Sequence, residues 1–185
     1  MMKTFKILLL AGGMLASAGL AAQAADADVS PGAYQNMGFY LRGDLGWSFL
    51  DWSGGSNDSA LELGAGAGYR LYDNMRADLR LDWAGDYNVA PGADLNVSSV
   101  LGNLYFDWAN DTSFTPYVGA GLGYGWTNAS PGTDKDGLAY GLMAGVSVDL
   151  TSNIAIDTEY RFRQVMISGS DPYEHQLMTG LRFEF

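Results

Sequence analysis

The sequence predicts an all-β fold, namely a closed eight-stranded antiparallel up-and-down transmembrane β-barrel. Apolar and polar residues alternate with a period of two over eight segments, which is the pattern of strands with two different faces. Within each segment the charged residues share one face and leave the other apolar. Aromatic residues of the apolar face gather near both ends of the segments, as they do at the two interfaces of a bilayer.

The composition excludes several classes of function. The 185 residues carry a formal net charge of −11, which argues against nucleic acid as a partner because phosphate binding needs clustered cations. Cysteine is absent, so a disulfide scaffold, a thiolate zinc site and a cysteine nucleophile are excluded. The alternating glycines, such as Gly64, Gly66 and Gly68, lack the strand-to-helix context of a phosphate-binding loop. We expect neither a cofactor nor a metal.

The start of the chain has the features of an export signal. Lys3 and Lys6 give a short positive region, residues 7–20 form an apolar stretch, and Ala22-Gln23-Ala24 offers a cleavage site. The apolar stretch falls short of the ~20 residues that a membrane-spanning helix needs. The predicted organisation is a signal peptide at 1–24, a short N-terminal leader at 25–36 and a barrel at 37–185.

Four strands are expected in the first half of the barrel. Their segments are 37–50, 60–71, 75–83 and 97–108. The apolar faces, in that order, are Phe39, Leu41, Leu45, Trp47 and Phe49; Leu61, Leu63, Ala65, Ala67 and Tyr69; Met75, Ala77, Leu79, Leu81 and Trp83; and Val100, Leu104, Phe106 and Trp108. The first residues of the fourth segment fit the alternation poorly, which allows a bulge there.

Four more strands complete the pattern. Their segments are 114–126, 138–150, 154–163 and 173–185. The apolar faces, in that order, are Val118, Ala120, Leu122, Tyr124 and Trp126; Tyr140, Leu142, Ala144, Val146 and Val148; Ile156, Tyr160 and Phe162; and Leu177, Leu181, Phe183 and Phe185. An even number of strands returns both termini to one side of the membrane.

Alternation alone fits a soluble barrel with an apolar core or a membrane barrel with an apolar outer wall. The export signal favours the membrane, as do segments of 9–14 residues, which are long enough for the ~9–11 of a tilted spanning strand. Connections alternate between short turns at 72–74, 109–113 and 151–153 and longer loops at 51–59, 84–95, 127–137 and 164–172. The expected aromatic girdles are Trp47, Trp83, Trp126 and Tyr140 at the long-loop end, and Tyr69, Phe106 and Trp108 at the other.

The charged face of each strand would then line the lumen. Its members are Arg42, Asp44, Glu62, Arg70, Arg76, Asp78, Arg80, Asp82, Asp107, Asp149, Asp157, Glu159, Arg161, Arg163, Glu174, Arg182 and Glu184. An eight-stranded barrel is only just wide enough for side chains to fill it, and guanidinium groups bind carboxylates in a bidentate manner. We therefore expect a network of ion pairs that plugs the lumen, with a narrow ion path or a gate made by switching pairs as the alternative.

Three stretches of sequence resemble known proteins. Residues 177–185 end in Phe with apolar residues at alternate positions, and they resemble the C-terminal assembly signal of bacterial outer-membrane barrels. Residues 103–107 and 116–124 resemble segments of the small eight-stranded outer-membrane β-barrel superfamily. Within it the sequence is most similar to the opacity-type and Omp25/Omp31-like surface proteins, which are related to the barrel domain of OmpA.

This resemblance covers residues 37–185 and implies a location in the bacterial outer membrane, with N- and C-termini in the periplasm. It implies as partners the outer-membrane lipid and lipopolysaccharide, the barrel assembly machinery and periplasmic chaperones. Leu181, Phe183 and Phe185 would form the assembly signal. Because the chain ends at Phe185, we do not expect the peptidoglycan-binding domain that follows the barrel in OmpA.

The single histidine, His175, is the candidate catalytic residue to consider. Small outer-membrane barrels that deacylate lipid A carry a Ser two residues after the catalytic His, whereas Leu177 follows His175 at that spacing. Glu174 is the neighbour of His175 in the strand and points to the opposite face, so it is not expected to orient the imidazole. His175 is expected at the outer rim, and the protein is expected not to be an enzyme.

The function predicted from sequence is a non-enzymatic outer-membrane surface protein that supports envelope integrity and surface contacts. A small low-conductance porin and an outer-membrane enzyme acting on lipid A are the two alternatives. Loops of this size can also carry contacts to an extracellular partner, which the sequence does not identify.

Overall fold

The computed structural model describes residues 38–51, 58–108, 110–130, 132, 134–167 and 173–185. The expected signal peptide and leader, residues 1–36, lie outside the described residues. No helix in the described part of the chain is long and apolar enough to cross a membrane.

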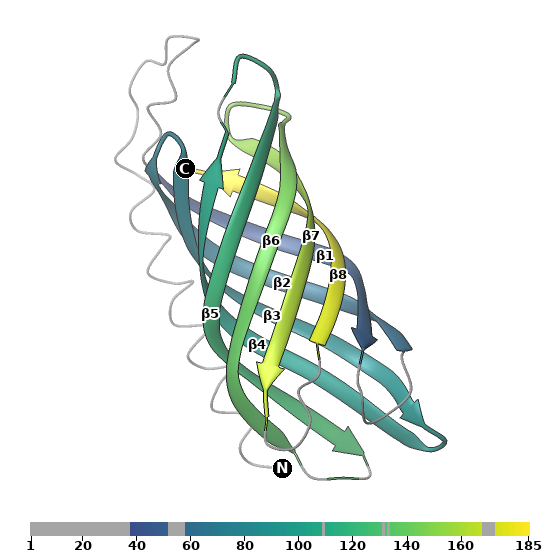
Figure 1. The fold of residues 1–185 in the computed structure, drawn as a ribbon. Coiled ribbons are helices and arrows are strands. Elements are labelled where there is room, and N and C mark those ends of the chain that lie inside the picture. The colour runs from purple at the N-terminus through teal and green to yellow at the C-terminus, as the bar shows by residue number, and fades with distance from the viewer. Residues whose placement is uncertain (1–37, 52–57, 109, 131, 133, 168–172) are drawn as a thin grey trace. The chain divides into compact units, whose positions relative to one another are not determined.

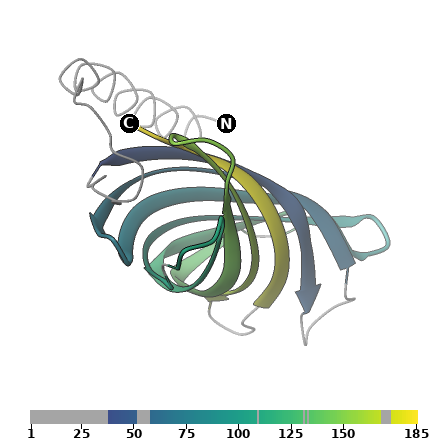
Figure 2. The same cartoon turned by 90° about the horizontal axis from the view of Figure 1, so that it is seen from above.

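The described chain consists of eight strands (Figure 1). They are β1 (Phe39–Asp51), β2 (Asp58–Tyr72), β3 (Met75–Ala90), β4 (Ala93–Asp107), β5 (Phe114–Ser130), β6 (Lys135–Asp149), β7 (Ile154–Met166) and β8 (Tyr173–Glu184). Each strand pairs in antiparallel fashion with the next, and β8 pairs with β1. The strands curve around one interior, as the view from above shows (Figure 2). The predicted closed eight-stranded antiparallel barrel is confirmed.

The two ends of the barrel differ in their connections. At the end where β1 begins and β8 ends, called here the termini end, residues 73–74, 108–113 and 150–153 join successive strands. At the other end, called the long-hairpin end, β3 and β4 continue to Ala90 and Ala93 and leave only Pro91 and Gly92 between them. Gly92 has a φ of 75°, a backbone conformation that glycine adopts without a steric penalty.

The loops expected at 84–95 and 127–137 are therefore mostly strand. Tyr87, Leu95 and Val97 are buried and continue the inner face of this hairpin, which keeps its ladder formed beyond the predicted end. The irregular pairing lies between Ala84 and Tyr87 and again near Asn88, so the bulge expected at the start of the fourth segment falls on its partner β3.

Burial alternates along the strands in the sense opposite to that of a soluble barrel. The inward parity carries most of the charged side chains of the strands, and away from the strand ends these are buried. Leucines of the outward parity are about half exposed; Leu122 retains 60% of its surface and Leu79 retains 48%. The large apolar residues thus form the outer wall and the charged residues fill the interior.

Glycines on the inner face make room for this filling. A Cβ atom at Gly119 would lie 2.6 Å from the ring of Tyr105, and one at Gly145 would lie 2.7 Å from the ring of Tyr117. The strictly alternating glycines of β2 and β5 therefore serve packing inside the barrel, because large side chains of neighbouring strands lie across them.

Candidate functional site

The candidate functional site is the ion-pair network inside the barrel, and its centre is Glu159 on β7. The Glu159 carboxylate accepts hydrogen bonds from Arg80 Nη1 at 2.5 Å, from Arg161 Nη2 at 3.1 Å and from the Tyr117 hydroxyl at 3.0 Å. Arg42 Nη2 lies 3.7 Å from the same carboxylate. One acidic group thus gathers three guanidinium groups from β1, β3 and β7 across the lumen.

Asp44 and Asp82 balance the charge of these arginines. Asp82 accepts from Arg80 Nε and from Arg161 Nη1, both at 2.7 Å. Asp44 accepts from Arg42 Nη2 at 2.7 Å and lies 3.5 Å from Arg80 Nε. Each pair is almost fully shielded from solvent, with side-chain exposure of 1% or less. Burial strengthens the attraction and makes the loss of any one partner costly.

A second layer lies toward the termini end. Arg76 binds Asp107 at 3.1 Å and Asp157 at 3.3 Å, and Arg182 Nε binds Asp157 at 3.1 Å. Arg70 binds Asp107 at 3.2 Å and Glu184 at 2.8 Å. Arg182 also contacts Glu184.

The guanidinium group of Arg76 lies over the rings of two tyrosines. The Arg76 carbon Cζ lies 4.6 Å from the centre of the Tyr105 ring and 4.5 Å from that of Tyr117, and the two rings pack edge to face. Such desolvated cation–π contacts are each worth about 2 kcal/mol or more. Met143 completes this aromatic cluster.

The third layer lies toward the long-hairpin end. Arg163 binds Glu174 at 2.7 Å and Glu62 at 3.1 Å, and it donates to the Ser99 hydroxyl at 3.1 Å. The hydroxyl of Tyr87 donates to Glu174 at 2.8 Å.

An apolar cluster lies inside the barrel toward the long-hairpin end. Its members are Leu50, Ala60, Ala84, Tyr87, Leu95, Val97, Leu101, Ala139, Val165 and Ile167. Leu101 comes from the middle of β4, and the other members come from parts of the chain nearer the long-hairpin end. The sequence analysis missed this cluster, although the inward parity of Leu95, Val97 and Leu101 gave a signal for it.

The structure brings most of the expected network residues together. All seven arginines of the chain are buried in the interior and ion-paired, and the expected carboxylates join them except one. Asp149, predicted as a member, is exposed at the termini end of β6. Its parity points it inward, but its position as the last residue of the strand leaves it at the mouth of the barrel, beyond the ion-paired layers.

Neutral polar residues that the sequence analysis did not assign to the network also take part in it. Asn103 Nδ2 donates to Asp78 at 2.7 Å and the Tyr40 hydroxyl donates to the same carboxylate at 3.2 Å. Ser147 accepts from Arg182 at 2.7 Å. Their shared inward parity with the charged residues was the available signal, because any polar group buried there needs a hydrogen-bond partner.

The expected aromatic girdle residues lie on the outer wall. Trp47 and Trp108 are each half exposed, and Trp83 retains 43% of its surface. Tyr69, Trp126 and Tyr140 are partly buried on the same parity. The expected assembly-signal residues Leu181, Phe183 and Phe185 are exposed as well.

His175 also lies on the outer wall, near the long-hairpin end of β8. Its Nδ1 atom and the Tyr160 hydroxyl form a hydrogen bond of 2.5 Å. Ser59 is the outward serine at the same level, but Phe49 pairs with Ser59 on one side and with His175 on the other. A side chain of β1 therefore stands between the hydroxyl and the imidazole. No group of three metal-binding side chains occurs among the residues that the structure describes.

Comparison with known proteins identifies the fold family. The family model described as "Outer membrane protein beta-barrel domain" matches residues 12–185. The chain belongs to this family. It is therefore a small eight-stranded outer-membrane barrel, and its exposed apolar wall faces membrane lipid rather than a partner sheet.

Several relatives of this outer-membrane barrel are known from sequence. An uncharacterised protein of Brucella abortus is 28% identical, over 84% of this chain and 80% of its own length. The outer membrane protein PagN of Salmonella typhimurium is 26% identical over 54% of this chain and 55% of its own. A candidate adhesin of Rickettsia conorii is 26% identical over 64% of this chain and 65% of its own.

Solved structures share the barrel fold at lower identity. Neisserial surface protein A superposes with a TM-score of 0.72 at 22% identity, covering 80% of this chain and 97% of that one. The Ail attachment invasion locus protein of Yersinia pestis gives a TM-score of 0.54 at 18% identity, covering 79% of this chain and 99% of the other. These likenesses show a shared fold.

Proposed function

We propose that this outer-membrane barrel is a non-enzymatic surface protein that supports envelope integrity and makes surface contacts, and that ion pairs keep its lumen closed. The observation that carries the proposal is the burial of every arginine of the chain among carboxylates inside the barrel. Three ion-paired layers and an apolar cluster follow one another along the interior. A passing ion would have to separate buried pairs and also enter an apolar layer, and both steps are costly.

The proposed orientation places both termini in the periplasm and the long-hairpin end outside the cell. Barrels of this class have short periplasmic turns and longer extracellular loops, and the β3–β4 and β5–β6 hairpins extend the wall at the long-hairpin end. The Rickettsia relative, a candidate adhesin, supports a surface role for the extracellular hairpins.

Conductance in planar bilayers tests the closed lumen. The purified barrel should give negligible conductance, whereas stable channels in the unaltered protein would refute the plug and favour the small porin. Replacing both Arg80 and Arg161 with alanine removes two guanidinium groups from the central layer. This variant should still be silent, because the other two ion-paired layers and the apolar cluster remain.

We further propose that the end of β8 is the signal that the barrel assembly machinery reads after periplasmic chaperones deliver the chain. The alternate residues Leu181 and Phe183 are exposed on the outward face of β8, and the last residue, Phe185, is exposed as well. Deleting Phe185 should lower the amount of folded barrel in outer-membrane fractions several-fold, while refolding of the purified chain into detergent stays unchanged. Equal loss in both assays would point to a folding defect instead.

The position of His175 supports the absence of enzymatic activity. A serine nucleophile and its base must lie within hydrogen-bond reach, about 2.6–3.2 Å, and Phe49 separates Ser59 from His175. Lipid A from a deletion strain should give an unchanged mass spectrum. A changed acylation pattern that the wild-type gene restores would revive the alternative of a lipid A-modifying enzyme.

A further inference from the structure

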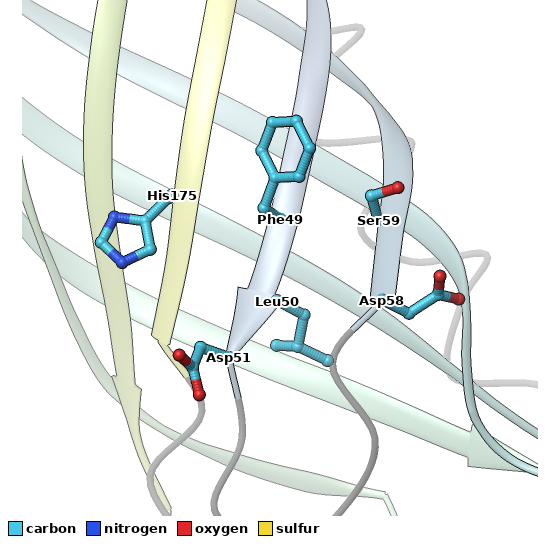
Figure 3. Close-up of a pocket in the computed structure, with 6 residues that line it drawn as sticks. All are labelled: Phe49, Leu50, Asp51, Asp58, Ser59 and His175. Carbon is cyan, nitrogen blue, oxygen red and sulfur yellow. The ribbon is translucent and has the colours of Figure 1, made fainter.

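A pocket lies at the rim of the barrel at the long-hairpin end, where β1 ends between β2 and β8 (Figure 3). Its volume is about 370 Å³, within the ~300–1,000 Å³ typical of small-molecule sites. Ser59, Phe49 and His175 stand at one level on the three strands, because Phe49 pairs with both of the others. Asp51 also lines the pocket, as do Leu50 and Asp58, which pair with each other and have the inward parity.

The polar groups of this pocket are mainly hydrogen-bond acceptors. Asp58 accepts from the backbone N–H of Asn88 at 2.6 Å, and a carboxylate has capacity for further donors. Asp51 contributes a second carboxylate, and the Ser59 hydroxyl can donate or accept. Two carboxylates repel an anionic ligand and attract hydroxyl or ammonium groups.

Aromatic rings border the pocket on the β7 side. The ring of His175 lies 6.0 Å from that of Tyr160, 5.7 Å from Phe162 and 5.6 Å from Tyr173, centre to centre. Phe49 adds a half-exposed ring within the pocket itself. Rings beside carboxylates suit a sugar, whose C–H faces pack on aromatic surfaces while its hydroxyl groups donate to acceptors.

The row of residues directly below the pocket is apolar. Trp47 pairs with both Leu61 and Leu177, so these three stand side by side, two positions closer to the middle of the strands. All three are exposed on the lipid-facing wall, and Leu45 and Leu63 continue the surface below them. A ligand of this site would therefore meet polar and aromatic groups at its head and a hydrocarbon-like surface along its tail.

We propose that this site binds a glycolipid, with its hydroxylated sugar headgroup in the pocket and its acyl chains along Trp47, Leu61 and Leu177. The apolar row favours an amphiphile over a soluble sugar, and the two carboxylates favour a sugar headgroup over an anionic phospholipid. The inference rests on the orientation proposed above, which places the pocket in the outer leaflet.

Native mass spectrometry of the folded barrel tests the site. The probe is diglucosyl diacylglycerol, compared with phosphatidylglycerol of the same acyl chains and with the free disaccharide. The unaltered barrel should retain the glycolipid at least about tenfold more tightly than either comparator. Equal retention of phosphatidylglycerol would overturn the recognition of a sugar, and equal binding of the free disaccharide would overturn the role of the acyl chains.

Variants locate the binding on the barrel surface. Replacing both Phe49 and His175 with alanine should weaken glycolipid retention about tenfold. Tyr124→Ala on β5 is the matched control, because Tyr124 is also an exposed ring that contacts a carboxylate, that of Asp136. Equal loss in the control and the double variant would overturn the site.

Two measurements on the same samples separate this inference from the proposed function. Heat-modifiability gels report folding, and bilayer conductance reports the state of the lumen. A folded, silent barrel without glycolipid preference overturns the site alone. A conducting barrel that still retains the glycolipid overturns the closed lumen alone.

Discussion

Replacing Glu159 with glutamine should destabilise the barrel more than any other single carboxylate-to-amide change in the central layer. The substitution keeps the size of the side chain and leaves an oxygen that can still accept from Tyr117, 3.0 Å away. It removes the negative charge that Arg80 and Arg161 bind at 2.5 and 3.1 Å and that Arg42 approaches to 3.7 Å.

The magnitude follows from what remains around those arginines. Breaking a buried pair by removing one partner costs about 3–5 kcal/mol when a charge is left uncompensated. Asp82 still binds Arg80 and Arg161, and Asp44 still binds Arg42, so compensation is partial. We therefore expect a loss of about 3 kcal/mol in the free energy of unfolding, roughly a hundredfold in the unfolding equilibrium constant.

Urea titration of the barrel in phosphatidylcholine vesicles, followed by tryptophan fluorescence, measures this change. Asp149→Asn provides the control, because Asp149 has the same inward parity on the neighbouring strand β6 but is exposed. Its effect should stay within about 0.5 kcal/mol, as for most surface substitutions. If the two variants unfold at the same urea concentration, the buried pairs do not act as the network described here.

Two further predictions concern the wall of the barrel. Leu79→Arg should block assembly in heat-modifiability gels, because an arginine on the lipid face at mid-depth costs about 2–4 kcal/mol. Asp78→Asn on the inner face should still assemble, with a lowered urea midpoint because the buried carboxylate near Arg42 loses its charge. Failure of both variants to assemble would contradict the assignment of faces. Gly145→Ala should lower the urea midpoint, since its Cβ would lie 2.5 Å from the backbone oxygen of Thr158, a clash of the kind that costs about 1–3 kcal/mol. Gly43→Ala has open space around the new methyl group and should leave that midpoint unchanged.

The strands and their faces could be predicted from the sequence because both depend on one local rule. Successive side chains of a strand point to opposite sides, so the parity of Arg80 or Leu79 follows from its neighbours without knowledge of the other strands. The ends of the strands obey no such rule. Pro91 and Gly92 form a tight turn, and the strands on both sides of it could have been extended from the parity of Tyr87 and Leu95.

The pairing of charges could not be predicted in the same way. Arg76 and Asp157 are 81 residues apart in the chain, and their contact depends on how far each strand is shifted relative to the next around the barrel. Parity also carries no information about height along the barrel axis. Asp149 and Glu159 were therefore equally good candidates for the network, although Asp149 lies at the mouth of the barrel and Glu159 lies at its centre.

The charged interior also helps to specify the strand register of this barrel. A shift of one residue in β7 would turn Arg161 and Arg163 toward lipid, at about 2–4 kcal/mol for each arginine at mid-depth, and would bring Tyr160 and Phe162 inside. An apolar interior would impose no such penalty, since either face could then meet the acyl chains. The ion pairs thus specify which face lies inside even if an apolar filling of the same shape were equally stable. Charges that specify the strand register need not form a path for ions. A charged lumen is therefore compatible with a closed one in this barrel.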